Sequence, residues 1–169
     1  MTEGVFVSYR RDDAPGHAGR LYDRLVTRFG EDRVFMDVDS IDPGEDFVEA
    51  IESTLASASV VIVVIGPAWV TLRDEQGVVR LTKPNDYVHL EVSRALELRK
   101  RVIPVLVADA QVPDVGELPA DLHALTRRNA IEISDGRFHS DADRLADAIA
   151  ESLAGAGGAG ASAGWVSQS

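Results

Sequence analysis

Cysteine is absent from the 169 residues of this chain. Its absence excludes disulfides, thiolate nucleophiles and every zinc site that is built on cysteine. Basic residues are also few, 17 lysines and arginines against 28 aspartates and glutamates, so the formal net charge is −11. Proteins that bind nucleic acid normally show the opposite balance, and we therefore expect no nucleic-acid partner.

Long hydrophobic runs are missing as well. No segment approaches the roughly 18 consecutive apolar residues of a membrane-spanning helix. The first four residues lead directly into a strand-like stretch, without the basic and apolar regions of a signal peptide. These absences predict a cytoplasmic protein with no membrane partner. The length and the 45% of hydrophobic residues fit one globular domain.

Short apolar runs alternate with amphipathic stretches along most of the chain. We expect strands at 5–7, 34–36, 60–65, 102–107 and 130–133, and helices at 16–29, 47–55, 86–100 and 142–153. All six residues of 60–65 are β-branched, which is typical of a strand buried on both faces. The alternation predicts an α/β fold, a flavodoxin-like three-layer sandwich with a five-stranded parallel sheet in the order 2-1-3-4-5.

The end of the chain has a different composition. Of the fifteen residues 155–169, twelve are glycine, alanine or serine, so we predict a domain over 1–153 and a flexible tail or linker over 154–169. The tail contains a literal G-x-G-x-x-G at 155–160. This motif follows a helix instead of a strand and opens no helix, so it is not a dinucleotide-binding fingerprint.

No metal site is expected. Three aspartates between 37 and 42 are spaced like the start of a calcium loop, but Asp42 stands where that loop needs glycine and Val48 where it needs glutamate. The four histidines are scattered along the chain, and we expect surface or capping roles for them.

In a sheet of this order, ligands bind beyond the carboxyl ends of strands 1 and 3. Arg10 and Arg11 lie at the first of these ends, where they could hold a pyrophosphate or form ion pairs with nearby aspartates. Trp69 and Tyr87 flank the same crevice and could stack on a ring or belong to the core.

The helix expected at 86–100 carries a carboxylate at the border of its apolar face. At about 100° per residue, Val88, Val92 and Ala95 share one stripe, and Glu91 falls at the edge of that stripe. A partly desolvated carboxylate is a strong partner for a cation. Glu91 is therefore either a functional carboxylate or a boundary residue that pairs with an arginine.

Five segments, in the same order along the chain, resemble the Toll/interleukin-1 receptor (TIR) domain of the bacterial type, over residues 4–153. They are VFVSYRRDD at 5–13, similar to the first box of the family; DVDSIDPGEDF at 37–47, similar to its BB loop; GPAW at 66–69; DYVHLE at 86–91, similar to the stretch with the catalytic glutamate; and RVIPV at 101–105, similar to the next strand. Gly66 departs from the family pattern, in which serine is usual at that position.

The resemblance implies an NAD⁺ nucleosidase that cleaves the nicotinamide–ribose bond of NAD⁺, as a hydrolase or also a cyclase, with no cofactor. It implies nicotinamide and ADP-ribose, or a cyclic isomer, as products. The catalytic residue that it implies is Glu91. The substrate-binding residues that it implies are Ser8, Arg10, Arg11, Asp37, Trp69 and Tyr87.

The resemblance also implies self-association with other TIR domains, in bacterial immune (anti-phage) signalling. The partner-binding residues of the BB loop would be Asp39, Ile41, Asp42, Pro43 and Gly44. Two alternatives stay open. One is a non-catalytic TIR scaffold or effector that acts through this loop, and the other is a sensor that binds a nucleotide without turnover.

Two further features bear on the ligand. The stretch 71–85 departs from a compact TIR pattern, and we expect either a positively charged lid over the ligand or a disordered insertion. Residues 31–52 hold nine acidic groups and one basic group, so the rest of the chain carries only −3 of the net −11. The global charge therefore does not count against an anionic ligand such as NAD⁺.

Overall fold

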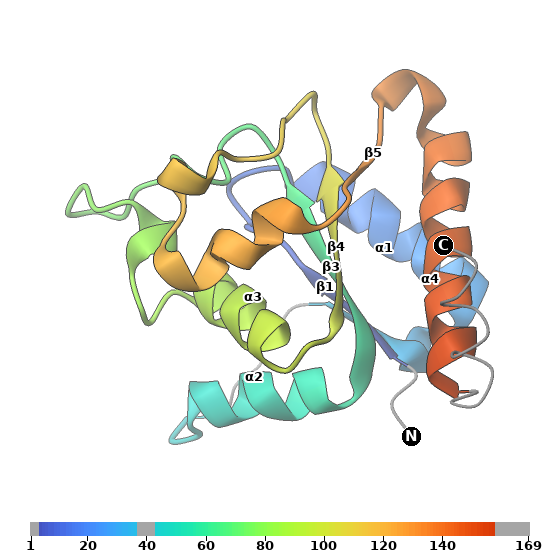
Figure 1. The fold of residues 1–169 in the computed structure, drawn as a ribbon, viewed down its shortest axis with the longest axis horizontal. Helices are drawn as coiled ribbons and strands as arrows, with labels where there is room; N and C mark the ends of the chain where they lie inside the picture. The colour runs from blue at the N-terminus through green and yellow to red at the C-terminus, as the bar shows by residue number, and fades with distance from the viewer. Residues whose placement is uncertain (1–3, 37–42, 158–169) are drawn as a thin grey trace.

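The β-branched residues 60–65 form the centre of a five-stranded sheet in a computed structural model, which describes residues 4–36 and 43–157 (Figure 1). The strands are β1 (Gly4–Ser8), β2 (Val34–Met36), β3 (Ala58–Ile65), β4 (Arg101–Leu106) and β5 (Ile131–Glu132). They pair in parallel in the order β2-β1-β3-β4-β5, which confirms the predicted topology.

Helices cover both faces of this sheet. The α-helices are α1 (Pro15–Phe29), α2 (Phe47–Ala56), α3 (Tyr87–Glu97) and α4 (Phe138–Gly157). Short 3₁₀ helices lie between them: η1 (Glu31–Arg33), η2 (Arg80–Thr82), η3 (Val115–Glu117), η4 (Ala120–Arg127) and η5 (Asp135–Arg137). Helices α1 and α4 pack together on one side of the sheet, and α2, α3 and η4 cover the other side (Figure 1). No helix of the described residues is both long and apolar enough to cross a bilayer.

The alternation of side chains along the strands divides the core into two clusters. Val5 and Val7 of β1 belong to the cluster under α1 and α4, whereas Phe6 points to the other face and joins the cluster under α2 and α3. Residues of β3 alternate in the same way, so its side chains are buried on both faces.

The termini of two helices are fixed by aspartate caps. Asp46 caps α2 by accepting hydrogen bonds from the amides of Val48 and Glu49, and Asp86 caps α3 by accepting one from the amide of His89. Such caps contribute about 1 kcal/mol each and set where a helix begins. The predicted start of the third helix, Asp86, is therefore its N-cap residue.

Two parts of the chain differ from the expected organisation. Helix α4 continues to Gly157, so the first residues assigned to the tail, 154–157, are helical; alanine favours the helix, and each of the two glycines costs only about 1 kcal/mol. The rest of the tail lies outside the described residues. Residues 108–129, for which the sequence predicted no element, contain η3 and η4, and Leu122 and Leu125 of η4 are buried in the second cluster.

Candidate active site

A buried hydrogen bond joins the end of β1 to the middle of α3. The Ser8 hydroxyl donates to Oε1 of Glu91 at 2.7 Å. Glu91 is only 5% exposed, although the helix angle placed it merely at the edge of the apolar stripe. A buried carboxylate is costly unless its oxygens accept hydrogen bonds, and Ser8 supplies one of them. The position of Glu91 is thus fixed by a strand that is 83 residues away in the sequence.

Arg10 makes a second connection between the same two elements. Its Nη1 and Nη2 donate to the two carboxylate oxygens of Asp86, at 2.9 and 2.7 Å. Arg10 is 4% exposed, and its Nε has no hydrogen-bond partner among the described residues. The sequence left open whether Arg10 binds phosphate or an aspartate, and in the structure it binds Asp86, a residue that the sequence had not indicated as a partner.

Asp13 fixes the turn that follows β3. Its two carboxylate oxygens accept hydrogen bonds from the amides of Gly66 and Ala68, at 2.7 and 2.8 Å. A side-chain carbon at position 66 would lie 2.6–2.8 Å from this carboxylate. The departure from the serine that is usual in TIR domains therefore has a structural cause, because Asp13 occupies the space.

A cavity of about 480 Å³ opens at the carboxyl end of β1, one of the two strand ends named by the prediction; the end of β3 is not part of its lining. Glu91 contributes to its wall, together with the rings of Tyr9 and Tyr87. The other charged residues of the wall are Arg10, Arg11, Arg80, Lys83, Asp12, Asp74 and Asp86. Four cations thus face four carboxylates, and the wall as a whole has no net charge.

The stretch 71–85 forms one side of the cavity. Arg73 and Val79 make an isolated antiparallel bridge, and the side chain of Leu81 is fully buried in the second cluster. Arg80 pairs with Asp12 at 3.0 Å, and Lys83 pairs with Asp74 at 2.6 Å. The stretch is therefore an ordered wall of the site and not a disordered insertion, and two of its three cations, Arg80 and Lys83, pair with carboxylates.

Tyr87 stacks on another aromatic ring. Its ring lies 5.2 Å from that of Phe47, with an angle of 29° between the planes. Tyr87 is the first residue of α3 and Phe47 the first residue of α2, so the stack joins the starts of two helices. Tyr87 lines the cavity and is partly exposed, so its ring can reach a ligand there, as the sequence predicted.

Trp69 lies elsewhere than predicted. Its side chain is 1% exposed, belongs to the second hydrophobic cluster and is not among the residues that line the 480 Å³ cavity. It lines a smaller cavity of about 200 Å³ with residues such as Pro113 and Asp114. The turn at 66–69 directs the indole into the core, so we assign it no contact with the ligand.

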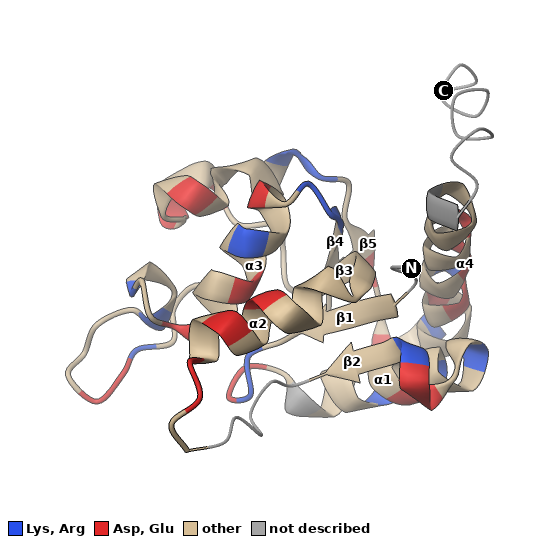
Figure 2. Ribbon diagram, turned by 90° about the horizontal axis from the view of Figure 1, so that it is seen from below, with Lys and Arg blue, Asp and Glu red and all other residues tan. Residues whose placement is uncertain are grey.

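The remaining predicted residues divide into two groups. Asp37, Asp39, Ile41 and Asp42 lie outside the described residues. Pro43 and Gly44 are exposed, and Gly44 has a φ of +86°, a conformation that favours glycine. Figure 2 shows that acidic residues follow one another along α2 and the segment that precedes it.

The expectation of a surface or capping role is wrong for His89. This side chain is buried, its Nδ1 lies 2.6 Å from the carbonyl oxygen of Leu81, and its Nε2 lies 2.8 Å from Oδ2 of Asp121. His89 therefore joins α3 to η2 and η4. Within residues 4–36 and 43–157, no three histidines, aspartates or glutamates are grouped so as to hold a metal ion.

The strand order and the two helical layers define a flavodoxin-like α/β domain with its cavity at the switch point of the sheet. The sequence model of the TIR domain matches residues 5–148, and the chain therefore belongs to the TIR domain family.

One curated relative and two solved structures illustrate the similarity. The chain is 28% identical over 132 residues to the NAD(+) hydrolase sarm1 of Drosophila melanogaster, in a match that covers 77% of this chain but only 9% of that protein. The TIR domains of the activated Roq1 resistosome, which recognises the effector XopQ, align with a TM-score of 0.60 at 13% identity, over 89% of this chain and 99% of that one. A TIR-STING receptor from C. gigas aligns with a TM-score of 0.55 at 22% identity, over 88% and 38%. The two structures share the fold.

Proposed function

We propose that this TIR domain cleaves NAD⁺ at the nicotinamide–ribose bond, with Glu91 as the catalytic carboxylate. The observation that carries the proposal is a carboxylate that is buried, held by Ser8 and yet part of the wall of a 480 Å³ cavity. That volume lies within the range of about 300–1,000 Å³ that is typical of small-molecule sites. The name of the Drosophila relative, an NAD(+) hydrolase, supports the same chemistry.

The reaction makes a limited demand on the protein. Nicotinamide in NAD⁺ is already cationic, so when the C1′–N bond breaks, the electron pair goes to the nicotinamide nitrogen and no general acid is needed. The ribose develops positive charge at C1′, and a nearby carboxylate stabilises it. Water then adds to C1′ and loses a proton, which gives ADP-ribose, nicotinamide and H⁺. A ring nitrogen of the adenine in place of water would give a cyclic isomer.

The groups around Glu91 suit the rest of this substrate. Tyr87 offers a ring for stacking, and the cations of the wall offer partners for the two phosphates. Ser8 orients the carboxylate through its hydroxyl. Arg10 holds the start of α3 through Asp86, so that the helix presents Glu91 at a fixed place.

We propose further that the domain works in an assembly with other TIR domains in immune signalling. The support is the exposed turn at Pro43 and Gly44 in the segment that resembles the BB loop, and the likeness of the fold to TIR domains of a resistosome. The rate of NAD⁺ cleavage per domain would then increase with protein concentration, because a neighbouring TIR domain would complete the active site of each domain.

Nicotinamide release tests the proposal. The measurement compares the wild type, Glu91→Gln and Glu97→Gln over a range of protein concentrations up to self-association. Glu97 is the matched control, because it lies on the same helix but is exposed and pairs with Arg94. We expect Glu91→Gln to lower kcat by about 10²-fold or more, as for the loss of other groups that stabilise transition-state charge, and Glu97→Gln to leave it within about twofold.

Three results would contradict the proposed activity. Equal rates of nicotinamide release for the wild type and Glu91→Gln would show that Glu91 has no part in the reaction. No release at any concentration would favour the scaffold, in which the charge reversal Asp42→Arg abolishes capture of a second TIR domain. Binding of NAD⁺ with no product over hours would favour the sensor.

A further inference from the structure

Three of the four cations of the cavity are paired with carboxylates of the same wall. Arg10 pairs with Asp86, Lys83 with Asp74 and Arg80 with Asp12, and all six residues line the cavity. An anionic ligand that binds one of these three cations has to compete with its carboxylate partner. The three pairs differ in what that exchange would cost.

The pair of Arg10 and Asp86 is the most expensive to open. It has two hydrogen bonds, and both side chains are largely withdrawn from water. Asp86 also caps α3 through the amide of His89. Separating the pair would leave a buried charge without compensation, which typically costs several kcal/mol. Arg10 is therefore a fixed part of the site.

The pair of Lys83 and Asp74 can open at a lower cost than the pair of Arg10 and Asp86. The Lys83 Nζ contacts Oδ2 of Asp74 at 2.6 Å, whereas Oδ1 accepts hydrogen bonds from the amides of Gln76 and Val78, both at 2.9 Å. When Lys83 leaves, Asp74 therefore keeps two of its three partners. Lys83 is 36% exposed, so its ammonium can reorient in solvent.

The charge of Asp74 is stabilised both by Lys83 and by amides of its own loop. The hydrogen bond from Lys83 and then that from the amide of Val78 hold the pKa of Asp74 below its ordinary value of 3.8. The carboxylate thus stays ionised at neutral pH and remains hydrogen-bonded to its own loop. Arg80 is similar, because it makes a single 3.0 Å contact with the exposed Asp12.

We infer that Lys83, assisted by Arg80, binds the diphosphate of the substrate, and that it does so by exchanging Asp74 for a phosphate oxygen. The stretch 71–85 would then select ligands that carry a diphosphate. The inference rests on the proposed function, because that function defines the ligand as a dinucleotide. It differs from the expectation that Arg10 and Arg11 hold the diphosphate, because Arg10 is tied to Asp86, and it gives that role to residues that the sequence had connected only with a lid.

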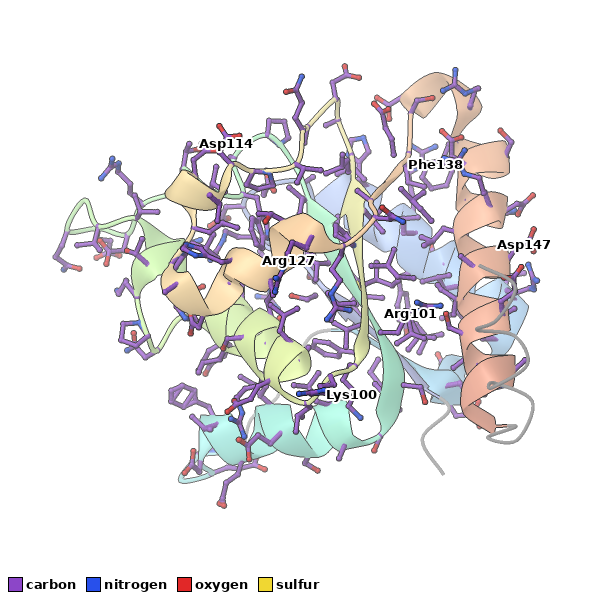
Figure 3. The ribbon with its side chains drawn as sticks, in the orientation of Figure 1. Lys100, Arg101, Asp114, Arg127, Phe138 and Asp147 are labelled. Atoms are coloured by element: carbon purple, nitrogen blue, oxygen red, sulfur yellow. The ribbon has the colours of Figure 1, made fainter. Side chains whose placement is uncertain are left out.

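Binding of ADP-ribose, measured by calorimetry at constant ionic strength, tests the inference without turnover. We expect Lys83→Gln to weaken binding about tenfold, the effect of losing one charge-assisted hydrogen bond. The only other lysine, Lys100, lies in the turn between α3 and β4 (Figure 3), away from the cavity lining, and Lys100→Gln should leave the affinity within about twofold.

A second variant gives a change of opposite sign. Asp74→Asn retains Oδ1 for the amides of Gln76 and Val78 and replaces only the oxygen that faces Lys83. Because no carboxylate then competes for Lys83, we expect ADP-ribose to bind about threefold more tightly. Binding of nicotinamide riboside, which has no phosphate, should be the same in the wild type, Lys83→Gln and Asp74→Asn.

The outcomes separate this inference from the proposed function. No binding of ADP-ribose to the wild type, or equal affinities for the wild type and Lys83→Gln, would overturn the role of Lys83. An equal loss of ADP-ribose and nicotinamide riboside binding in Lys83→Gln would overturn it as well, because it would show a general disturbance of the cavity. If ADP-ribose binding depends on Lys83 but no nicotinamide is released, the inference stands and the proposed reaction fails.

Discussion

Replacing Gly66 by alanine is expected to disrupt the turn after β3. The new side-chain carbon would lie 2.6 and 2.7 Å from the two carboxylate oxygens of Asp13, well inside van der Waals contact. Asp13 would have to move and would lose its hydrogen bonds to the amides of Gly66 and Ala68. Serine, which is usual here in TIR domains, would meet the same obstacle.

The cost follows from these two bonds. A hydrogen bond to a charged group contributes about 1.5–3 kcal/mol, and partial rehydration of the half-buried Asp13 recovers some of it. We therefore expect Gly66→Ala to lower the free energy of unfolding by about 3 kcal/mol. For a domain of this size, that corresponds to a fall in Tm of about 6–12 °C.

Urea and thermal denaturation, followed by circular dichroism, measure the effect. Gly116→Ala is the control, because a side-chain carbon at Gly116 meets no atom within 4 Å, and its effect should stay within about 0.5 kcal/mol. In an Asp13→Ala background, Gly66→Ala should cost much less than in the wild type. The reasoning is refuted if the two glycine substitutions have equal effects, or if the Asp13 and Gly66 substitutions are additive.

Three further predictions concern the site and the pH dependence. Ser8→Ala should lower kcat for nicotinamide release about tenfold with the Kd for NAD⁺ nearly unchanged, because the hydroxyl orients Glu91; a change in Kd alone would contradict this. Trp69→Phe should leave the release rate within about twofold, because the indole lies in the core, and a large loss would restore its predicted ligand contact. The amide of Ser134 donates a hydrogen bond to Asp141 and holds the pKa of Asp141 below 3.8. The stability that results is present above pH 3.8 and is lost as the pH falls through the lowered pKa. The urea midpoints of the wild type and Asp141→Asn should therefore differ at about pH 7 and converge near pH 2.

The sheet with its strand order, and one of the two strand ends expected at the ligand site, could be predicted from the sequence alone. Hydrophobic periodicity is a local property, and the β-branched run at 60–65 and the alternation of strands with helices were enough to predict the order β2-β1-β3-β4-β5. The helix angle of Glu91 placed a carboxylate at the core boundary, next to the edge where such sheets bind ligands. The resemblance to TIR domains, carried by five segments, is confirmed by the family match.

Which charged and polar groups pair with one another could not be predicted from the sequence. Arg10 pairs with Asp86, 76 residues away. Asp13 accepts hydrogen bonds from the amides of Gly66 and Ala68, more than 50 residues away. Charged residues are numerous, and the sequence records their order along the chain but not the distances between side chains of different elements. Whether a cation is fixed, like Arg10, or exchangeable, like Lys83, depends on those distances and on burial, which arise only when strands and helices pack together.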